Sequence, residues 1–164
     1  MTDKIKEILT GKFGVSVVIR EDNPGTQAQI VVLKDKIADI CDELWRNEIT
    51  YFDFLSCITC IDNLKEQKFE VIYNLYSIPY NLTCVLKVEV GRNNEVDSLP
   101  AVPSVTPVYK SANWHEREIY DMFGVLFTGH PDMRRILLPA DWEGFPLRKD
   151  YKQQEYYHGI KVEY

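Results

Sequence analysis

The residues best suited to chemistry lie between Asn113 and Tyr151, where acids, bases and aromatic side chains crowd into less than a quarter of the chain. The candidate metal ligands are His115, Glu116, Glu118, Asp121 and His130. Carboxylates and imidazoles are common ligands of Zn²⁺. The spacing is not H-E-x-x-H, however, and only one carboxylate could share a helical face with His115. A small metal-dependent enzyme therefore stays open as one alternative.

Glu118 and Asp121 are a second candidate, because carboxylates three residues apart on one helical face can couple as a general acid and a general base. No recognisable nucleophile or ligand cradle stands near them in the sequence. The simpler interpretation of each charged residue here is a local ion pair. The arginines available for such pairs are Arg117, Arg134 and Arg135.

Cys57 and Cys60 form a C-x-x-C, a spacing that redox and zinc sites use. The surrounding DFLSCITCID is typical of a buried strand, on which residues three apart point to opposite faces. No second cysteine pair or Cys/His pair stands at zinc-like spacing. We therefore expect these two cysteines, with Cys41 and Cys84, to be small core residues.

A short helix must position the acidic cluster. Asn113 fits an N-cap and Glu116 the third helical position, so a capping box predicts a helix from Trp114 to about Phe123. Gly124 suits the position just after the last turn. The residues expected to share one face of this helix are Trp114, Glu118 and Asp121.

The upstream residues predict the element order α-β-β-α-β-β-β. Helices are expected over residues 3–11 and 35–48, the second with Asp35 as its N-cap and with apolar residues at i, i+3, i+4 and i+7. The expected strands are 15–20, 27–33, 51–62, 68–78 and 83–90, the first two joined as a hairpin by EDNPGT. The simplest arrangement is an α+β fold, a two-layer domain whose helices cover one face of a mixed, mostly antiparallel sheet.

The character of the sequence changes near residue 92, where RNNEVDSLPAVPSVTPVYKSAN predicts a long connection with three prolines. We therefore divide the chain into an α+β domain (1–95), a connecting segment (96–112), and a short helix with an extended, irregular tail (113–164). The tail carries Trp142, Phe145 and Tyr151. Because Trp, Tyr and Arg dominate interface hot spots, we expect the tail to lie along a partner.

Composition narrows the classes of function. Hydrophobic residues make up 45% of the 164 residues, enough for a core, and the net charge of −6 argues against a nucleic-acid binder or a polybasic membrane anchor. The amphipathic N-terminus is unlike a signal peptide, and no apolar run approaches the roughly 20 residues that span a bilayer. We expect an intracellular chain with no membrane span of its own, which could still sit at a membrane through partners.

The stretch from Asn113 to Tyr151 resembles the signature of the 30-kDa subunit of respiratory complex I, which is the C subunit of the type-I NADH:quinone oxidoreductases. The matching positions are Glu116, Arg117, Glu118, Asp121, Met122, Phe123, His130, Arg134, Ile136 and Leu137. The downstream DWEG-x-P-L-R-K-D-Y, from Asp141 to Tyr151, is similar as well. Two positions depart from the family pattern: Phe145 stands where many members have His, and Lys152 where Pro is common.

This resemblance implies a non-catalytic structural subunit in the hydrophilic arm of a proton-pumping complex, peripheral to the membrane on its cytoplasmic side (matrix or stromal side in an organelle). It implies docking beside the 49-kDa-type subunit and near the iron–sulfur subunits, with iron–sulfur clusters, FMN and quinone on the partners and no cofactor on this chain. The same role in a membrane-bound hydrogenase, a ferredoxin-driven complex or a plastid-type complex I is the nearest alternative. The residues expected at the partner interface are Trp114, Glu116, Arg117, Glu118, Asp121, His130, Arg134, Arg135, Trp142, Arg148 and Tyr151.

Overall fold

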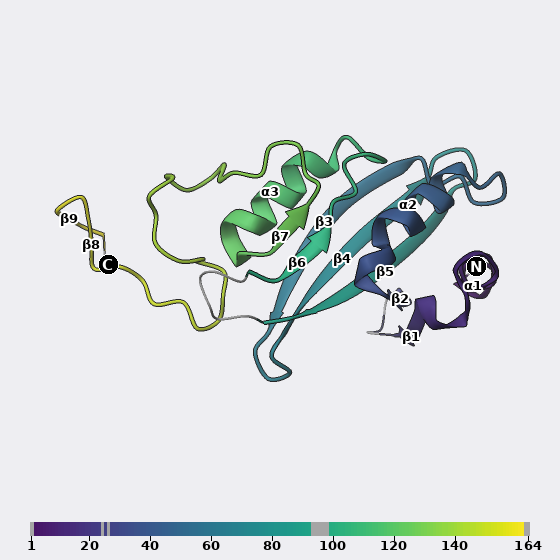
Figure 1. Cartoon of the computed structure of the whole chain (residues 1–164), viewed down its shortest axis with the longest axis horizontal. Helices are drawn as coiled ribbons and strands as arrows, with labels where there is room; N and C mark the ends of the chain where they lie inside the picture. Colours follow the sequence, from purple (N-terminus) through teal and green to yellow (C-terminus); the bar gives the residue numbers. More distant parts are fainter. Residues whose placement is uncertain (1, 24, 26, 93–98, 163–164) are drawn as a thin grey trace.

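A computed structural model describes residues 2–23, 25, 27–92 and 99–162 (Figure 1). The helices are α1 (Thr2–Phe13), α2 (Ile37–Arg46) and α3 (Ala112–Phe123), with short 3₁₀ turns η1 (Val15–Val17) and η2 (Lys34–Lys36). The main strands are β1 (Val18–Asp22), β2 (Gln29–Val32), β3 (Phe54–Asn63), β4 (Lys68–Ser77) and β5 (Leu82–Gly91). Shorter strands are β6 (Ala101–Pro103), β7 (Leu126–Thr128), β8 (Tyr156–Tyr157) and β9 (Ile160–Lys161). The predicted α+β class and the order α-β-β-α-β-β-β are confirmed.

The five main strands form one mixed sheet in the order β1-β2-β5-β4-β3. The β1–β2 hairpin and the β3–β4 and β4–β5 pairs are antiparallel, as the sequence predicts. The parallel contact is between β2 and β5, because β5 enters the sheet between the two hairpins. The central strand of the sheet is therefore the last of the five in sequence.

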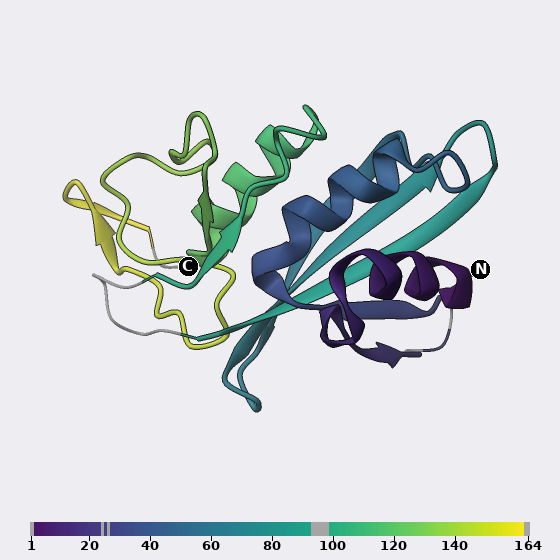
Figure 2. The same cartoon turned by 45° about the vertical axis from the view of Figure 1, so that its right-hand side comes forward.

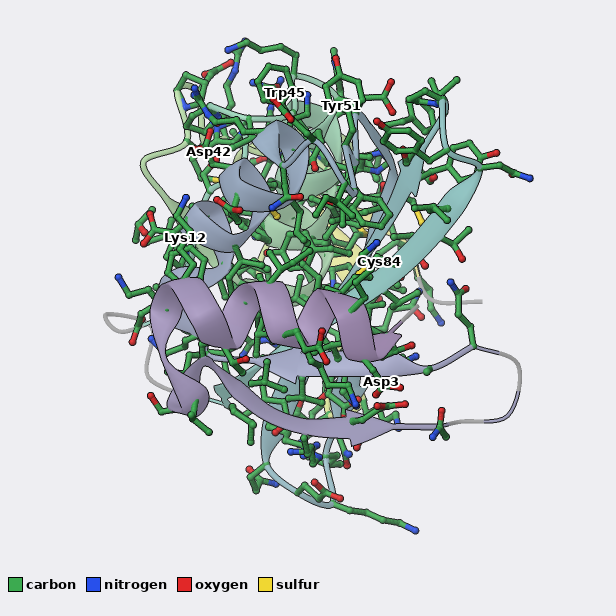
Figure 3. All side chains as sticks on the ribbon, turned by 90° about the vertical axis from the view of Figure 1, so that its right-hand side faces the viewer. Asp3, Lys12, Asp42, Trp45, Tyr51 and Cys84 are labelled. Carbon is green, nitrogen blue, oxygen red and sulfur yellow. The ribbon has the colours of Figure 1, made fainter. Side chains whose placement is uncertain are left out.

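The helices α1 and α2 cover one face of this sheet (Figure 2). The buried residues of α2, Ile37, Ile40, Cys41 and Leu44, repeat at helical spacing and meet the alternate residues Val71, Tyr73 and Leu75 of β4 in one core. Trp45, at the end of α2, stacks on Tyr51 with 6.3 Å between the ring centroids (Figure 3). Apolar residues from all three predicted segments of the chain enter the same core.

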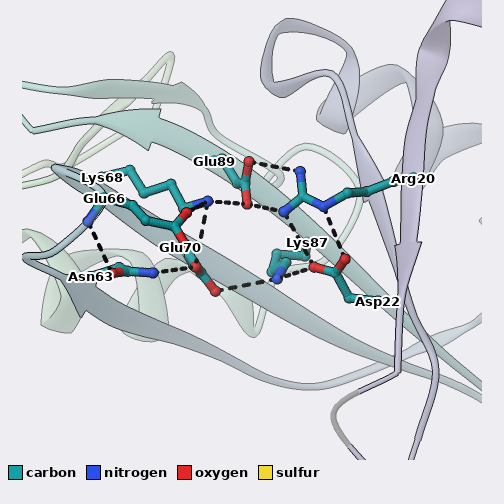
Figure 4. Close-up of polar contacts among 8 residues, drawn as sticks. All are labelled: Arg20, Asp22, Asn63, Glu66, Lys68, Glu70, Lys87 and Glu89. Atoms are coloured by element: carbon teal, nitrogen blue, oxygen red, sulfur yellow. Dashed lines mark hydrogen bonds and ion pairs between the residues drawn. The ribbon is translucent and has the colours of Figure 1, made fainter.

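The opposite face of the sheet carries an ion-pair network (Figure 4). Lys87, only 5% exposed, lies 2.6 Å from Asp22 Oδ2 and 3.3 Å from Glu70 Oε2. Arg20 pairs with both Asp22 and Glu89. Charged side chains thus provide the cover on this face that helices provide on the other.

The C-x-x-C residues point to opposite faces of β3, as predicted. Cys60 is buried in the core, whereas Cys57 accepts a hydrogen bond from Asn74 Nδ2 at 3.2 Å on the other face. All four cysteines are free, and Cys41 and Cys84 are buried. Burial raises the pKa of the Cys84 thiol to about 12, as suits an unreactive core residue.

Two local predictions need correction. Asp35 does not cap α2, since it lies within η2 and the N-cap is Lys36, without a side-chain cap. The proline-rich connection contains a short strand: β6 lies within it and pairs in parallel with β7, which follows α3 in the sequence. The contact of the tail with a partner stays a prediction; up to Tyr151 the tail also folds back on its own chain, where Leu147 N–H donates to Met122 O at 3.1 Å. Residues 93–98 of the connection lie outside the described part.

Candidate functional site

The helix α3 carries most of the predicted site, but it begins differently from the prediction. It starts at Ala112, and its N-cap is Ser111 with no side-chain cap hydrogen bond, so the capping box of Asn113 and Glu116 is wrong. Glu116 instead accepts hydrogen bonds from the loop after β6. The predicted end is confirmed: Gly124 follows the last turn with a φ of 70°, and its N–H donates to Tyr120 O.

The carboxylate of Glu116 points into the protein and is 0% exposed. One oxygen accepts the Val105 N–H at 2.7 Å, and the other accepts the hydroxyl of Ser104 at 2.6 Å. Ser104 Oγ also lies 2.7 Å from the hydroxyl of Thr106. Burial raises the pKa of Glu116 to about 7, against the opposing effect of these two hydrogen bonds. Glu116 therefore fastens α3 to residues 104–106.

The carboxylate of Asp121 is likewise 0% exposed, at the other end of α3. Its Oδ2 accepts three consecutive backbone N–H groups, from Ile136, Leu137 and Leu138, at 2.7–3.0 Å. Its Oδ1 accepts Arg135 Nη1 at 2.8 Å. Burial opposes ionisation, but the four donors outweigh it and hold the pKa of Asp121 below its usual 3.8. Asp121 thus organises the loop that follows β7.

The outward side of α3 displays aromatic and charged groups. Trp114 is 64% exposed, and the guanidinium of Arg117 lies 5.1 Å from the centre of its ring. His130 Nδ1 accepts the Asp132 N–H at 3.0 Å, so the other ring nitrogen donates to Asn113 O at 3.2 Å. Burial, followed by the charge of Arg117, lowers the pKa of His130. A neutral histidine thus ties the loop after β7 to the start of α3.

The tail contributes a second aromatic and arginine cluster. The guanidinium of Arg148 lies 4.7 Å from the Phe145 ring and 5.1 Å from the Phe69 ring, while its Nε donates to Phe123 O at 2.6 Å. Trp142 Nε1 donates to the hydroxyl of Tyr151 at 3.1 Å. These contacts hold residues 142–151 against the C-terminal end of α3.

The eleven predicted interface residues differ in burial: three are buried, including Arg117 at 7% exposure, three are exposed and five are partly buried. Glu116 and Asp121 are fully buried, so they can shape a partner surface but cannot touch one. Among the others, Trp114, Glu118 and Arg134 are exposed, and their contact with a partner stays a prediction. Trp114, Glu118 and Asp121 keep the i, i+4, i+7 spacing of one face of α3, but residues 135–138 cover Asp121 at its far end.

The structure also bears on the two catalytic alternatives, the acid–base pair and the metal site. Glu118 is exposed and Asp121 is buried, so the two carboxylates do not meet as an acid–base pair. Within residues 2–23, 25, 27–92 and 99–162, no three His, Cys, Asp or Glu side chains converge as metal ligands. Sequence reasoning missed Ser104, Asp62 and Arg92, whose roles depend on contacts far apart in sequence and have no local pattern.

Replacing Gly124 by alanine is expected to lower the free energy of unfolding by about 2–3 kcal/mol. A Cβ here would lie 2.5 Å from the Phe145 ring and 2.7 Å from Arg148 Nη2, in a backbone with φ near +70°. Gly129→Ala is the matched control, with a φ of +82° and no atom within 4 Å of the added Cβ. Urea denaturation followed by fluorescence should show the larger loss at Gly124; equal losses would contradict the close packing.

The described residues contain no helix that is both long and apolar enough to cross a bilayer. The family described as "Respiratory-chain NADH dehydrogenase, 30 Kd subunit" matches residues 30–157. The chain is 42% identical over 171 residues to the C subunit of the NADH-quinone oxidoreductase of Chlorobium phaeobacteroides, covering 100% of both chains. It is 40% identical over 153 residues to the corresponding NADH-quinone oxidoreductase subunit of Geobacter sulfurreducens, covering 92% of this chain and 87% of the relative.

A solved structure is similar over most of the fold. It is titled "Structure of the membrane-bound sulfane sulfur reductase (MBS), an archaeal respiratory membrane complex", and its matching chain has a TM-score of 0.72 and 25% identity, covering 92% of this chain and 85% of that chain. The family match extends from β2 to the end of β8 and includes all of α3 and its buried carboxylates. The chain therefore belongs to the family of the 30-kDa subunit of respiratory-chain NADH dehydrogenase.

Proposed function

We propose that this chain is a non-catalytic structural subunit of a proton-pumping NADH:quinone oxidoreductase. It lies in the hydrophilic arm, on the cytoplasmic side of the membrane or the equivalent organelle compartment, and docks beside the 49-kDa-type subunit and the iron–sulfur subunits. Its relatives, which are named as C subunits of NADH-quinone oxidoreductases, support this assignment. The chain acts by position: it keeps the redox subunits in register, so that electrons reach quinone.

The observation that carries this proposal is the inward use of the signature carboxylates. Glu116 and Asp121 accept hydrogen bonds from the chain's own backbone and hold α3 against the neighbouring loops, so that Trp114 and Glu118 on the helix and Arg134 on the loop after β7 face solvent. An exposed tryptophan braced by an arginine is the side-chain chemistry of interface hot spots. A rigid surface also loses less conformational entropy on binding.

The cofactors belong to the partners in this proposal. Iron–sulfur clusters, FMN and quinone bind the neighbouring subunits, and the isolated chain has no redox activity of its own. Purified chain should therefore contain no stoichiometric metal, whereas the intact complex should be rich in iron. Metal on the purified chain in a 1:1 ratio would favour the enzyme alternative instead.

A second candidate is the equivalent role in a related membrane complex. It is favoured by the similarity to a chain from the sulfane sulfur reductase structure, an archaeal respiratory membrane complex. The two candidates share the docking chemistry and differ in the electron donor and acceptor of the whole assembly.

The experiment that tests both is affinity purification of the tagged chain from native membranes in mild detergent, followed by mass spectrometry and metal analysis. Recovery of NADH- and quinone-reactive subunits supports the proposal. Recovery of hydrogenase-type or sulfur-reductase subunits supports the second candidate. A lone chain contradicts both.

Trp114→Ala is expected to reduce incorporation into the complex by about tenfold, since an interface tryptophan contributes more than about 1 kcal/mol to binding. The fold should persist, because this side chain is 64% exposed. Val15→Ala is the control, an exposed apolar residue (83%) in η1, which follows α1 and is far from α3 in sequence. The measurement is the amount of complex recovered per tagged chain. Glu118→Ala should also reduce incorporation. Normal incorporation with lost turnover would argue for a catalytic role instead.

A further inference from the structure

Residues 145–150, here called the strap, lie between the C-terminal end of α3 and the adjoining ends of β3 and β5. On the helix side the strap is held by backbone carbonyls, because Leu147 N–H donates to Met122 O and Arg148 Nε donates to Phe123 O. On the strand side it meets two buried charges. Figure 1 shows this part of the chain passing beside the ends of β3 and β5.

The buried charges are those of Asp62, on β3, and Arg92, just after β5, whose side chains are each 1% exposed. Arg92 Nε lies 2.9 Å from Asp62 Oδ1, and Arg92 Nη2 donates to Asp62 Oδ2 at 3.1 Å. The same Oδ2 accepts the backbone N–H of Lys149 at 2.8 Å. One buried carboxylate on β3 therefore bonds two segments that are distant in sequence, the residue after β5 and the strap.

Asp150 completes the arrangement from the strap itself. Arg92 Nη1 donates to Asp150 Oδ2 at 3.0 Å, although the side chain of Asp150 is 46% exposed. The hydrogen bond that Arg92 donates to Asp150 is the largest cause that raises the pKa of Arg92. Because water and salt screen this outer pair, it holds the strap less firmly than the buried pair does.

We propose that Asp62, Arg92 and Asp150 form a latch that keeps the strap folded on the free chain, so that partners bind a surface that is already in place. An irregular segment of this kind would otherwise order only on binding, at an entropic cost. The latch also positions Arg148 between the rings of Phe69 and Phe145, next to the C-terminal end of α3. The existence of partners rests on the proposed function, but the latch itself is a property of the isolated chain.

The test is hydrogen exchange of the isolated full chain, resolved by residue with NMR, in the native protein and in Asp62→Asn. The Lys149 and Leu147 amides should exchange roughly tenfold to a hundredfold faster in the variant, as expected for loss of a hydrogen-bonded charge. Amides in the centre of β4, such as that of Val71, should change little. Asp132→Asn is the control, because this half-exposed acid pairs with Arg134 and does not touch the strap.

Equal exchange at Lys149 in the native chain and in Asp62→Asn would overturn the latch. If Asp62→Asn does not fold, Asp150→Asn takes its place, with a smaller acceleration that is again confined to the strap; unchanged exchange there would also overturn it. A native chain with a protected strap that fails to co-purify with an oxidoreductase would refute the proposed function and leave the latch standing. A chain that co-purifies but has an unprotected strap would refute the latch alone.

Discussion

Asp121→Asn is expected to lower the free energy of unfolding by about 3–5 kcal/mol at pH 7, the loss typical of removing one partner from a buried ion pair. Asparagine has nearly the same shape, so the effect measures charge and hydrogen bonding. Its amide group must face either the three N–H groups of residues 136–138 or the guanidinium of Arg135, and in both cases a donor meets a donor. Urea denaturation followed by tryptophan fluorescence measures the difference.

The pH dependence gives this prediction a second check. Because the folded pKa of Asp121 is below 3.8, its stabilisation is present above about pH 3.8 and is lost as the pH falls through the folded value. The difference between the two proteins should therefore shrink in acid. Asp132→Asn, in a half-exposed pair with Arg134, should cost less than about 1 kcal/mol. A loss that small at Asp121 would mean that the buried carboxylate does not hold the loop.

Glu116→Gln is expected to change the response of the protein to pH in the opposite direction. The pKa of Glu116 is about 7 in the folded chain against 4.5 unfolded, so the native state binds the extra proton between these values. The contribution of protonated Glu116 to the free energy of unfolding is fully present below about pH 4.5 and is lost as the pH rises through 7. The loss amounts to about 3 kcal/mol. Glutamine keeps an acceptor for Val105 and a donor for Ser104, and it does not titrate.

The measurement is the free energy of unfolding of both proteins at several pH values from 4.5 to 8. The stability of Glu116→Gln relative to the natural chain should rise by about 3 kcal/mol over this range. Glu118→Gln is the matched control, the same substitution at an exposed position of the same helix. Parallel profiles for Glu116→Gln would show that the buried carboxylate ionises with an ordinary pKa.

Periodicity predicted the main sheet because each element there has a strong local pattern. The alternation in β4 and the helical spacing in α2 each place one buried face, and the turn residues between β1 and β2 close the hairpin. Strand ends moved by only a few residues. The short β6–β7 pair was missed because three-residue strands next to prolines have no such periodicity.

The candidate site was harder to predict, because its acids are defined by partners rather than by spacing. Glu116 fits a capping box by residue type, yet the loop at residues 104–106 offers it a hydroxyl and an N–H inside the protein. Arg135 was correctly expected to pair with a carboxylate of α3, and Asp121 is its partner. The three N–H donors from residues 136–138 depend on a loop conformation that residue types alone do not specify.

The central position of β5 in the sheet affects how the protein folds while it is being synthesised. Neither hairpin, β1–β2 or β3–β4, can join the other until the ribosome has released the chain as far as Gly91, because β5 lies between them. During synthesis both hairpins therefore present a strand edge that lacks its neighbour. Such non-local pairing slows folding and leaves apolar surface open to aggregation. The nascent protein should need chaperone protection most while residues 30–90 are emerging from the ribosome, before α3 has emerged.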